Sequence, residues 1–292
     1  MKSRWLINIV MLAIVLGLGT YFYLRPKPEA VQTKAYDISQ IKLADIVSIQ
    51  VDLPNKPLMT FKKVNKLWQM IAPYPARLDQ QSINHIISVV AAQSNNKFSS
   101  SDLAKFGLNE PKLKLTLNEE LFIFGAFNSV TSEQYVMYKD AIYLLPGSYL
   151  ELASIQTTAL LDKSPIAQDE KIIGFDLSGL EQWQENQLNV DLVDGKWQVN
   201  DPKLSVNQAA MQEWFDGYWT GMSVSAVEPY SLQSTEKLPG FSVKLSNGKT
   251  IRFDKFQESP TLILGRPDEG IKYTIASDIG FVLLNPPLES AK

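Results

Sequence analysis

The sequence predicts an α+β protein: an N-terminal transmembrane helix followed by two tandem copies of a mainly antiparallel β-sheet unit, each with one principal helix. Three observations support this prediction. A long apolar run begins near the N-terminus. Most of the remaining chain consists of short segments in which apolar and polar residues alternate, as in half-buried strands. A Trp-Gln pair with a proline five residues after the tryptophan occurs at Trp68 and again at Trp197, each time before a stretch with helical apolar spacing.

The composition is that of a globular protein and excludes several functions. The chain has 292 residues, 45% hydrophobic and 20% charged, with a formal net charge of −3. This length suits one large domain or two domains of ordinary size. The slightly acidic balance provides no basic field for a nucleic acid, so no nucleic-acid partner is expected. The absence of cysteine excludes disulfides, thiolate metal sites, cysteine nucleophiles and a lipid-modified cysteine.

Residues 1–24 are predicted to form a transmembrane signal anchor. The apolar run from Trp5 to Leu24 is about 20 residues long, which as a helix spans about 30 Å, the thickness of the hydrocarbon core of a bilayer. Aromatic residues lie at both ends of the run, as at membrane interfaces. The alternative is a cleaved signal peptide with a cleavage site at Gly17-Leu18-Gly19. The apolar run continues past that site, which favours an uncleaved anchor.

The orientation follows from the size of the exported body. Basic residues lie on both sides of the apolar run, so the positive-inside rule gives only a slight bias. A short N-terminal tail is easily retained in the cytoplasm, and we therefore expect a single-pass protein of the bacterial inner (cytoplasmic) membrane with its C-terminal body in the periplasm. Residues 25–43 are predicted to be a linker, in which Arg25-Pro26-Lys27-Pro28 is typical of a stiff extended spacer.

The first α+β repeat is predicted at residues 44–164. Its principal helix is expected over Gln80–Ala92 and a second helix over Ser148–Leu161. Residues 93–101 are predicted to be a polar loop, and residues 102–108 a short helix closed by a glycine. The strands expected in this unit are Ile46–Val51, Leu58–Val64, a short strand at Trp68, Lys112–Leu117, Leu121–Phe124, Gln134–Tyr138 and Ala141–Leu145.

The second repeat is predicted at residues 165–292, with the same order of elements. Asn207 takes the place of Asp79 as the N-cap of the principal helix. Four apolar residues then keep the same spacing in both copies, Ile83, Ile86, Ile87 and Val90 in the first and Met211, Trp214, Phe215 and Tyr218 in the second.

The strands of the second repeat are expected to follow those of the first. Tyr273 with Asp278 has the same separation as Tyr135 with Asp140, which we interpret as a further correspondence between the copies. Turn sequences Asp194-Gly195 and Asn247-Gly248 favour hairpins. The predicted strands are Ile173–Leu177, Leu188–Val193, a short strand at Trp197, Phe241–Leu245, Thr250–Phe253, Thr261–Leu264, Lys272–Ile275 and Phe281–Leu284.

One pattern of residues is shared with a known family. It comprises Leu67-Trp68-Gln69, Pro73, Asp79, the turn from Phe106 to Pro111, Phe124-Gly125 and Gln134-Tyr135-Val136. It resembles the bacterial domain-of-unknown-function 4340 family, most specifically in the Gly-Leu-(Asn/Asp)-x-Pro turn between Gly107 and Pro111. The second copy keeps Trp197 and Pro202 but has Leu238-Pro239-Gly240 in place of that turn.

The resemblance implies one membrane-spanning helix and no particular reaction. Members of the family are often encoded beside ABC-type transporters similar to the gliding-motility type, so the resemblance implies an accessory role in transport. The residues that define the repeats are expected to be structural: Trp68, Pro73, Gly107, Pro111, Trp197 and Pro202.

No catalytic, cofactor-binding or metal site is predicted. His85 is the only histidine and is expected at the surface of its helix, so no histidine cluster can form. The chain contains neither a Gly-x-Ser-x-Gly elbow nor a phosphate-binding glycine loop, and it is therefore not a transporter ATPase. The carboxylate pairs Glu119-Glu120 and Asp268-Glu269 lie in expected turns, where solvated carboxylates lack the pKa separation that acid–base catalysis needs.

An aromatic cluster in the second copy allows two interpretations. Trp214, Phe215, Tyr218 and Trp219 could form a platform for a sugar or peptide, or they could be the core face of the principal helix. The helical spacing favours the core. Trp219 is the exception, because Ala91 stands at its place in the first copy, and we predict it as an exposed partner contact.

The function predicted from the sequence is a non-catalytic, membrane-anchored periplasmic accessory or binding protein of an envelope assembly, such as an ABC-type transport system. Its expected partners are the membrane, through the N-terminal helix, and other membrane or envelope proteins. No cofactor is expected. Two alternatives are a periplasmic ligand receptor with its site between the two repeats, and an envelope hydrolase that uses carboxylates in an unrecognised arrangement.

Overall fold

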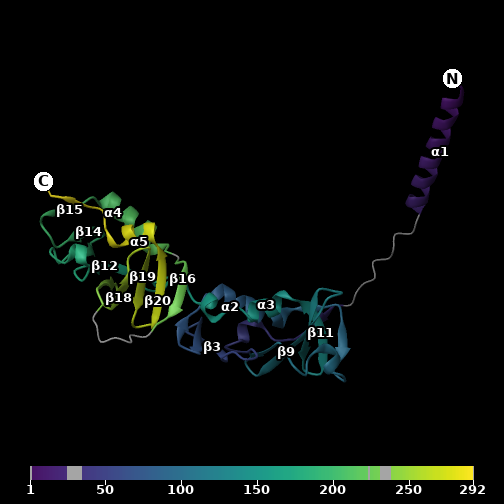
Figure 1. Cartoon of the computed structure of the whole chain (residues 1–292), viewed down its shortest axis with the longest axis horizontal. Helices are drawn as coiled ribbons and strands as arrows, with labels where there is room; N and C mark the ends of the chain where they lie inside the picture. Colours follow the sequence, from purple (N-terminus) through teal and green to yellow (C-terminus); the bar gives the residue numbers. More distant parts are fainter. Residues whose placement is uncertain (1, 25–34, 223, 231–237, 292) are drawn as a thin grey trace.

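The computed structural model describes residues 2–24, 35–222, 224–230 and 238–291. The structure is α+β, as predicted, with mostly antiparallel β-sheets and a few helices. Two large sheets follow one another along the chain, the first coloured blue to teal and the second green to yellow (Figure 1). Two smaller pairs complete the strands, β1 (Tyr36–Asp37) with β6 (Gln93–Ser94) and β15 (Leu204–Val206) with β21 (Leu288–Ser290).

The N-terminal segment is helical, and α1 extends over Lys2–Leu24. In the described part of the chain, no helix is both long and apolar enough to cross a membrane. The predicted membrane span is therefore not confirmed. The predicted spacer Arg25-Pro26-Lys27-Pro28 lies outside the described residues.

The first large sheet has nine strands in the order β5-β4-β3-β2-β8-β9-β10-β11-β7, and all neighbours are antiparallel. Apolar residues alternate along the strands, so one face is buried against the helices. The strands are β2 (Ser48–Asp52), β3 (Met59–Val64), β4 (Leu67–Ala72), β5 (Ala76–Arg77), β7 (Lys97–Ser99), β8 (Leu113–Leu117), β9 (Glu120–Asn128), β10 (Glu133–Tyr138) and β11 (Ala141–Pro146).

The second large sheet has eight antiparallel strands in the order β14-β13-β12-β17-β18-β19-β20-β16. If β5 is set aside, the strands of the two sheets have the same spatial order relative to the chain. The strands are β12 (Ile172–Asp176), β13 (Asn189–Val193), β14 (Lys196–Val199), β16 (Ala226–Pro229), β17 (Gly240–Leu245), β18 (Thr250–Gln257), β19 (Thr261–Arg266) and β20 (Ile271–Ala276).

Each sheet has a principal helix, which follows β5 in the first unit and β15 in the second. α2 (Gln80–Ile87) begins at Asp79 and α4 (Gln208–Phe215) at Asn207, and each N-cap side chain accepts hydrogen bonds from the first turn, as predicted. The last turns differ, because α2 continues as the 3₁₀ helix η2 (Ser88–Ala91) and α4 as the π-helical turn η6 (Asp216–Thr220). The other helices are α3 (Ser148–Ala153), α5 (Ser277–Leu284) and the 3₁₀ turns η1 (Leu43–Asp45), η3 (Ala104–Phe106), η4 (Thr157–Leu160) and η5 (Glu181–Trp183).

A glutamine at the start of each principal helix holds the tryptophan of the preceding strand. Gln80 Oε1 accepts from the backbone N–H of Trp68 at 2.7 Å, and its Nε2 donates to the Trp68 carbonyl at 3.0 Å. Gln208 makes the same two bonds with Trp197, at 2.9 and 2.7 Å. A side-chain amide offers a donor and an acceptor as a peptide group does, so each glutamine replaces a strand neighbour. We refer to these two contacts as the Gln–Trp clamps.

A glycine turn covers the other face of the first sheet. Phe106 and Leu108 pack with Ile142 in a cluster separate from the main core. Gly107 has a φ of 65°, and a Cβ added to it would lie 2.8 Å from Cβ of Ala126 on β9. The turn can therefore approach the strand this closely only with glycine at position 107.

Three local predictions were wrong. The segment Phe281–Leu284 is part of α5 and not a strand; a run of four apolar residues does not distinguish the two, and Gly280 lets the helix lie against Leu262, which a Cβ would approach to 2.5 Å. The expected helix over Ser148–Leu161 is divided into α3 and η4. The polar loop at 93–101 contains β6 and β7.

The proposed correspondence of Tyr135 with Tyr273 is also wrong. Tyr135 lies on β10, whereas Tyr273 lies on β20, which occupies the place that β11 has in the first sheet. The residue at that place on β11 is Tyr143, which pairs with β7 as Tyr273 pairs with β16. Equal separation in the sequence was not evidence of equal position, because the hairpins differ in length.

We predict that Gly107→Ala destabilises the protein more than Gly195→Ala. Both glycines have positive φ, but a Cβ at Gly195 meets nothing within 4 Å. Gly195→Ala should therefore cost only the backbone strain, about 1 kcal/mol, and Gly107→Ala about 2–4 kcal/mol because the clash with Ala126 is added. Urea unfolding followed by tryptophan fluorescence measures both, and equal losses would refute the role of close approach.

Candidate functional site: a cleft between the two sheet units

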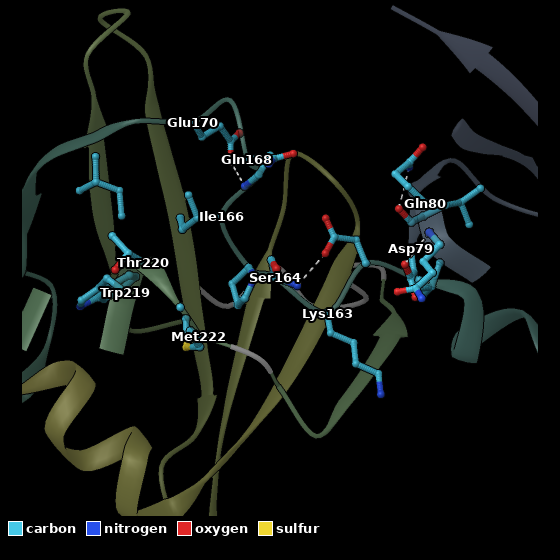
Figure 2. A pocket seen from close by; sticks show the side chains of 18 of the residues that line it. Asp79, Gln80, Lys163, Ser164, Ile166, Gln168, Glu170, Trp219, Thr220 and Met222 are labelled. Carbon is cyan, nitrogen blue, oxygen red and sulfur yellow. Dashed lines mark hydrogen bonds between the residues drawn. The ribbon is translucent and has the colours of Figure 1, made fainter. Parts of the chain in front are cut away.

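A cleft of about 1180 Å³ lies where the two sheet units meet. Three segments line it: the start of α2 (78–82), the connection between the units (159–172) and the end of the second principal helix (215–222). In Figure 2, Asp79 and Gln80 lie on one side of the view, Trp219 and Met222 lie on the other, and the connection passes between them.

Arg77, at the end of β5, joins the two units. Its Nε donates to Glu269 Oε1 at 2.7 Å, and its Nη2 donates to the hydroxyl of Tyr273 at 3.0 Å. Nη2 also reaches the carbonyl of Ser164 at 2.6 Å, and Nη1 donates to the carboxylate of Asp162. Glu269 and Tyr273 belong to the second unit, whereas Asp162 and Ser164 belong to the connection. A single guanidinium thus ties the first unit to both.

A second group of ion pairs surrounds Arg266, at the end of β19. Its side chain is only 3% exposed, and its two terminal nitrogens donate to the carboxylate of Glu170 at 2.8 and 2.5 Å. It also donates to the carbonyl of Pro165 at 2.8 Å and to Asp268 at 3.0 Å. Glu269 lies 3.4 Å from Arg266 Nη1 and so is shared with Arg77. We call the two arginines and their partners Asp162, Glu170, Asp268, Glu269 and Tyr273 the junction network.

The junction network shifts the pKa of Glu170, Tyr273 and Arg266. Burial alone would raise the pKa of Glu170, but hydrogen bonds from Arg266 and from the N–H of Ala167 outweigh it and lower that pKa. Burial, with the charge of Glu269 beside it, raises the pKa of the Tyr273 hydroxyl. The pKa of Arg266 is raised because its bonds to carboxylates outweigh its desolvation. Each arginine is paired with at least two carboxylates of the network, which suits a structural role.

The carboxylates that line the cleft all have partners. Asp79 accepts hydrogen bonds at 2.9 Å from the N–H of Gln81 and from the hydroxyl of Ser82, so it is the cap of α2. Asp162 and Glu170 belong to the junction network. The cleft also contains two exposed cations, Lys163 and Lys171, and neither forms an ion pair within the residues that the structure describes.

Trp219 is buried, and its prediction as an exposed partner contact is wrong. Its side chain is 2% exposed and its ring lies 4.7 Å from that of Phe175 and 5.8 Å from that of Phe241, centroid to centroid. The cause is the π-helical turn η6, whose wider spacing puts Trp219 on the core face beneath Trp214. Its indole N–H is buried and has no hydrogen-bond partner among the described residues.

The other residues singled out from the sequence lie apart from the cleft. Trp68 and Trp197 are buried in the core at the Gln–Trp clamps, whereas Pro73 and Pro202 are exposed beyond the ends of β4 and β14. Gly107 and Pro111 flank the turn on the first sheet. The structure thus gives these residues structural positions and does not bring them together in one site.

Among the residues that the structure describes, the candidate acid–base groups do not form a catalytic arrangement. His85 is exposed on α2, as predicted. Glu269 was expected to be solvated, but it is half-buried between two arginines and Tyr273, and Glu120 accepts from the hydroxyl of Tyr138 at 2.9 Å. Among the described residues, no group of three or more histidines and carboxylates is placed to hold a metal ion.

Sequence reasoning missed Arg77 and Arg266. Neither belongs to a motif, and each meets its partners only through the fold, since Glu269 is far from Arg77 in the sequence. The one available signal was local: Arg266 stands just before the Asp268-Glu269 pair, and a cation beside paired acids in a loop is a reason to expect an ion-pair cluster.

The fold and the cleft define a class, a two-unit α+β protein whose antiparallel sheets are joined by buried ion pairs. Within it, residues 68–237 match the family described as "Domain of unknown function (DUF4340)", and the chain belongs to this family. The match includes the whole connection between the units. Neither the curated proteins nor the solved structures contain a match to this chain.

We predict that Glu170→Gln reduces stability at neutral pH and that this difference fades in acid. The folded protein lowers the pKa of Glu170 below its ordinary value of 4.5, so the folded state binds fewer protons than the unfolded state. The stabilisation by Glu170 is therefore present above pH 4.5 and lost as the pH falls through the folded pKa. Thermal unfolding of wild type and variant from about pH 7 down to about pH 3, across the carboxyl range, measures the difference.

A matched control is Glu185→Gln, which removes an exposed carboxylate outside the network. It should leave stability nearly unchanged at every pH, because exposed charges contribute little. A Glu170→Gln difference that stays constant down to the lowest pH would contradict the assigned ionisation.

Proposed function

We propose that the protein is a non-catalytic, membrane-anchored accessory or binding protein of the bacterial cell envelope, with its body on the periplasmic side. The observation that carries this proposal is the cleft between the units. Its carboxylates are engaged in capping and in the junction network, so none is free to act as an acid or base, while the cleft itself is open to a partner or ligand.

The proposed anchor is the helix at residues 1–24. The sequence supports it through the apolar run from Trp5 to Leu24 and through the basic residues before that run. The proposed periplasmic side is supported by the positive-inside rule, to which the basic residues before the run give a slight bias.

We also propose that the body arose as a duplicated unit. The common strand order of the two sheets supports this, as does the recurrence of the Gln–Trp clamp with the same atoms in both units. In both units the segment before the principal helix pairs with the C-terminal segment of the unit. Leu78 forms a β-bridge with Leu161 in the first unit, and β15 pairs with β21 in the second.

The partner we propose is an integral membrane assembly such as an ABC-type transport system. Its support is what the family resemblance implies, since such transporters are often encoded beside members of the family. A second candidate function, a ligand receptor with its site between the units, is favoured by the size and position of the cleft. A hydrolase has less support, because the cleft carboxylates are already paired.

The test of the partner is affinity purification of the full-length tagged protein from membranes after mild crosslinking. We expect an integral membrane protein to be recovered in stoichiometric amount, and not with an unrelated tagged protein that has the same anchor. Recovery of no integral membrane partner under these conditions would count decisively against the accessory role.

The absence of cysteine allows a direct test of the side of the membrane. Val130 is 91% exposed, so Val130→Cys should react in intact cells with a maleimide that crosses the outer but not the inner membrane. Ser3→Cys, before the apolar run of the proposed anchor, should react only after lysis. If the thiol introduced by Val130→Cys is protected until lysis, the body lies in the cytoplasm and the proposed location is refuted.

A further inference from the structure

We propose that the cleft between the units binds a small organic anion, with a carboxylate or phosphate group at Lys163 and Lys171 and an apolar body on the second unit. This inference rests on the binding function proposed above and names the ligand class for it. The argument proceeds from which polar groups of the cleft are already satisfied and which are not.

The carboxylates of the cleft and two of its backbone carbonyls already accept hydrogen bonds from within the protein. The carboxylates of Asp79, Asp162 and Glu170 all accept from protein donors. The carbonyls of Ser164 and Pro165 accept from the two arginines of the junction network. A cationic ligand would have to displace these arginine bonds, which are charge-assisted and mutually supporting.

The donors, in contrast, are still free. Lys163 and Lys171 both line the cleft and are exposed, and no ion pair engages either of them in the described chain. In Figure 2 the side chain of Lys163 extends away from that of Ser164. The excess of unused donors favours a ligand rich in acceptors.

Trp219 adds a second, independent observation. Its side chain lines the cleft, and its indole N–H is buried without a partner among the described residues, which is unfavourable in a folded protein. It lies on the π-helical turn η6, and such turns are frequent at functional sites. The equivalent turn of the first unit, η2, is 3₁₀ and contains Val89 and Val90 instead. The unusual backbone and the unpaired donor thus coincide where the two units differ.

The apolar part of the ligand has a surface on which to pack. Among the apolar side chains that line the cleft, Ile166 and Phe215 are partly exposed, and a ligand that was only an ion would leave them in contact with water. The volume of about 1180 Å³ is at the upper end for small-molecule pockets, which leaves room for the ligand and for bridging water. The apolar lining residues include Leu161, Ile166, Ile172, Phe215 and Met222.

The experiment is isothermal titration of the full-length protein in lipid nanodiscs, with empty nanodiscs as the blank. The probes are 3-phenylpropionate, phenyl phosphate and the neutral 3-phenylpropanamide. We expect saturable binding of at least one anion, about tenfold weaker binding of the amide, and weaker anion binding as salt is raised. The preferred anion identifies the carboxylate or the phosphate as the head group.

Three variants locate the site. Lys163→Met with Lys171→Met keeps the aliphatic stems and removes both charges, and it should weaken anion binding about tenfold or more. Lys196→Met, at an exposed lysine of β14 outside the cleft, is the matched control and should bind as wild type does. Trp219→Phe removes the indole N–H and should weaken binding about three- to tenfold. If that variant unfolds, the lysine variants decide.

The proposal is overturned if neither anion binds saturably at millimolar concentration, if the amide binds as tightly as the anions, or if the double lysine variant binds as the Lys196→Met control does. Failure here is distinct from failure of the accessory function. Recovery of a membrane partner together with absent anion binding would remove the ligand site and leave the accessory role in place.

Discussion

The structure depends on the charge of Arg266 being balanced in the interior. A guanidinium does not lose its proton in a protein, so its burial at 3% exposure requires anionic partners with good geometry. Glu170, in the connection between the units, is one such partner. Glu269 lies close to both arginines and so links Arg266 to Arg77 of the first unit. The path of the connection and the mutual position of the sheets both follow from these bonds. The cleft lies beside these bonds, because Asp162, Ser164, Pro165 and Glu170 also line it.

Within each unit the Gln–Trp clamp has a comparable role at smaller scale. It joins the strand that carries the tryptophan to the first residue of the principal helix, which fixes where the helix begins relative to the sheet. The tryptophan ring packs in the core while its backbone is held by the amide. The Trp-Gln-…-Pro pattern of the sequence therefore marks an architectural joint. Function is better sought where the units differ, as they do at η2 and η6.

Much of the fold could be predicted from the sequence, because periodicity and capping are local properties. The N-caps Asp79 and Asn207 and the central strands were placed correctly. The edge strands β7 and β16 were missed, since they are short and are strands only through pairing with β11 and β20. α5 was mistaken for a strand because its stability comes from packing over Gly280.

The candidate site was less accessible to sequence reasoning. Burial of Trp219 depends on a π-helical turn, and no simple periodicity predicts an inserted residue. The junction network brings together residues of both units and of the connection, and each of them alone resembles an ordinary surface charge. Glu269 shows the difficulty: the loop sequence predicted solvation, whereas two arginines from different units enclose it.

The strand order also determines when each unit can fold. β7 comes before β8 in the chain, yet it pairs only with β11, the last strand of its sheet. β16 likewise pairs only with β20, the last strand of the second sheet. Neither sheet can be completed until the whole unit has been synthesised, so each unit folds late and with long-range contacts. The first unit can nevertheless close before the second emerges, with Arg77 held at first by Asp162 and by the carbonyl of Ser164. Arrival of Glu269 then docks two preformed bodies, which makes the junction the last step of assembly.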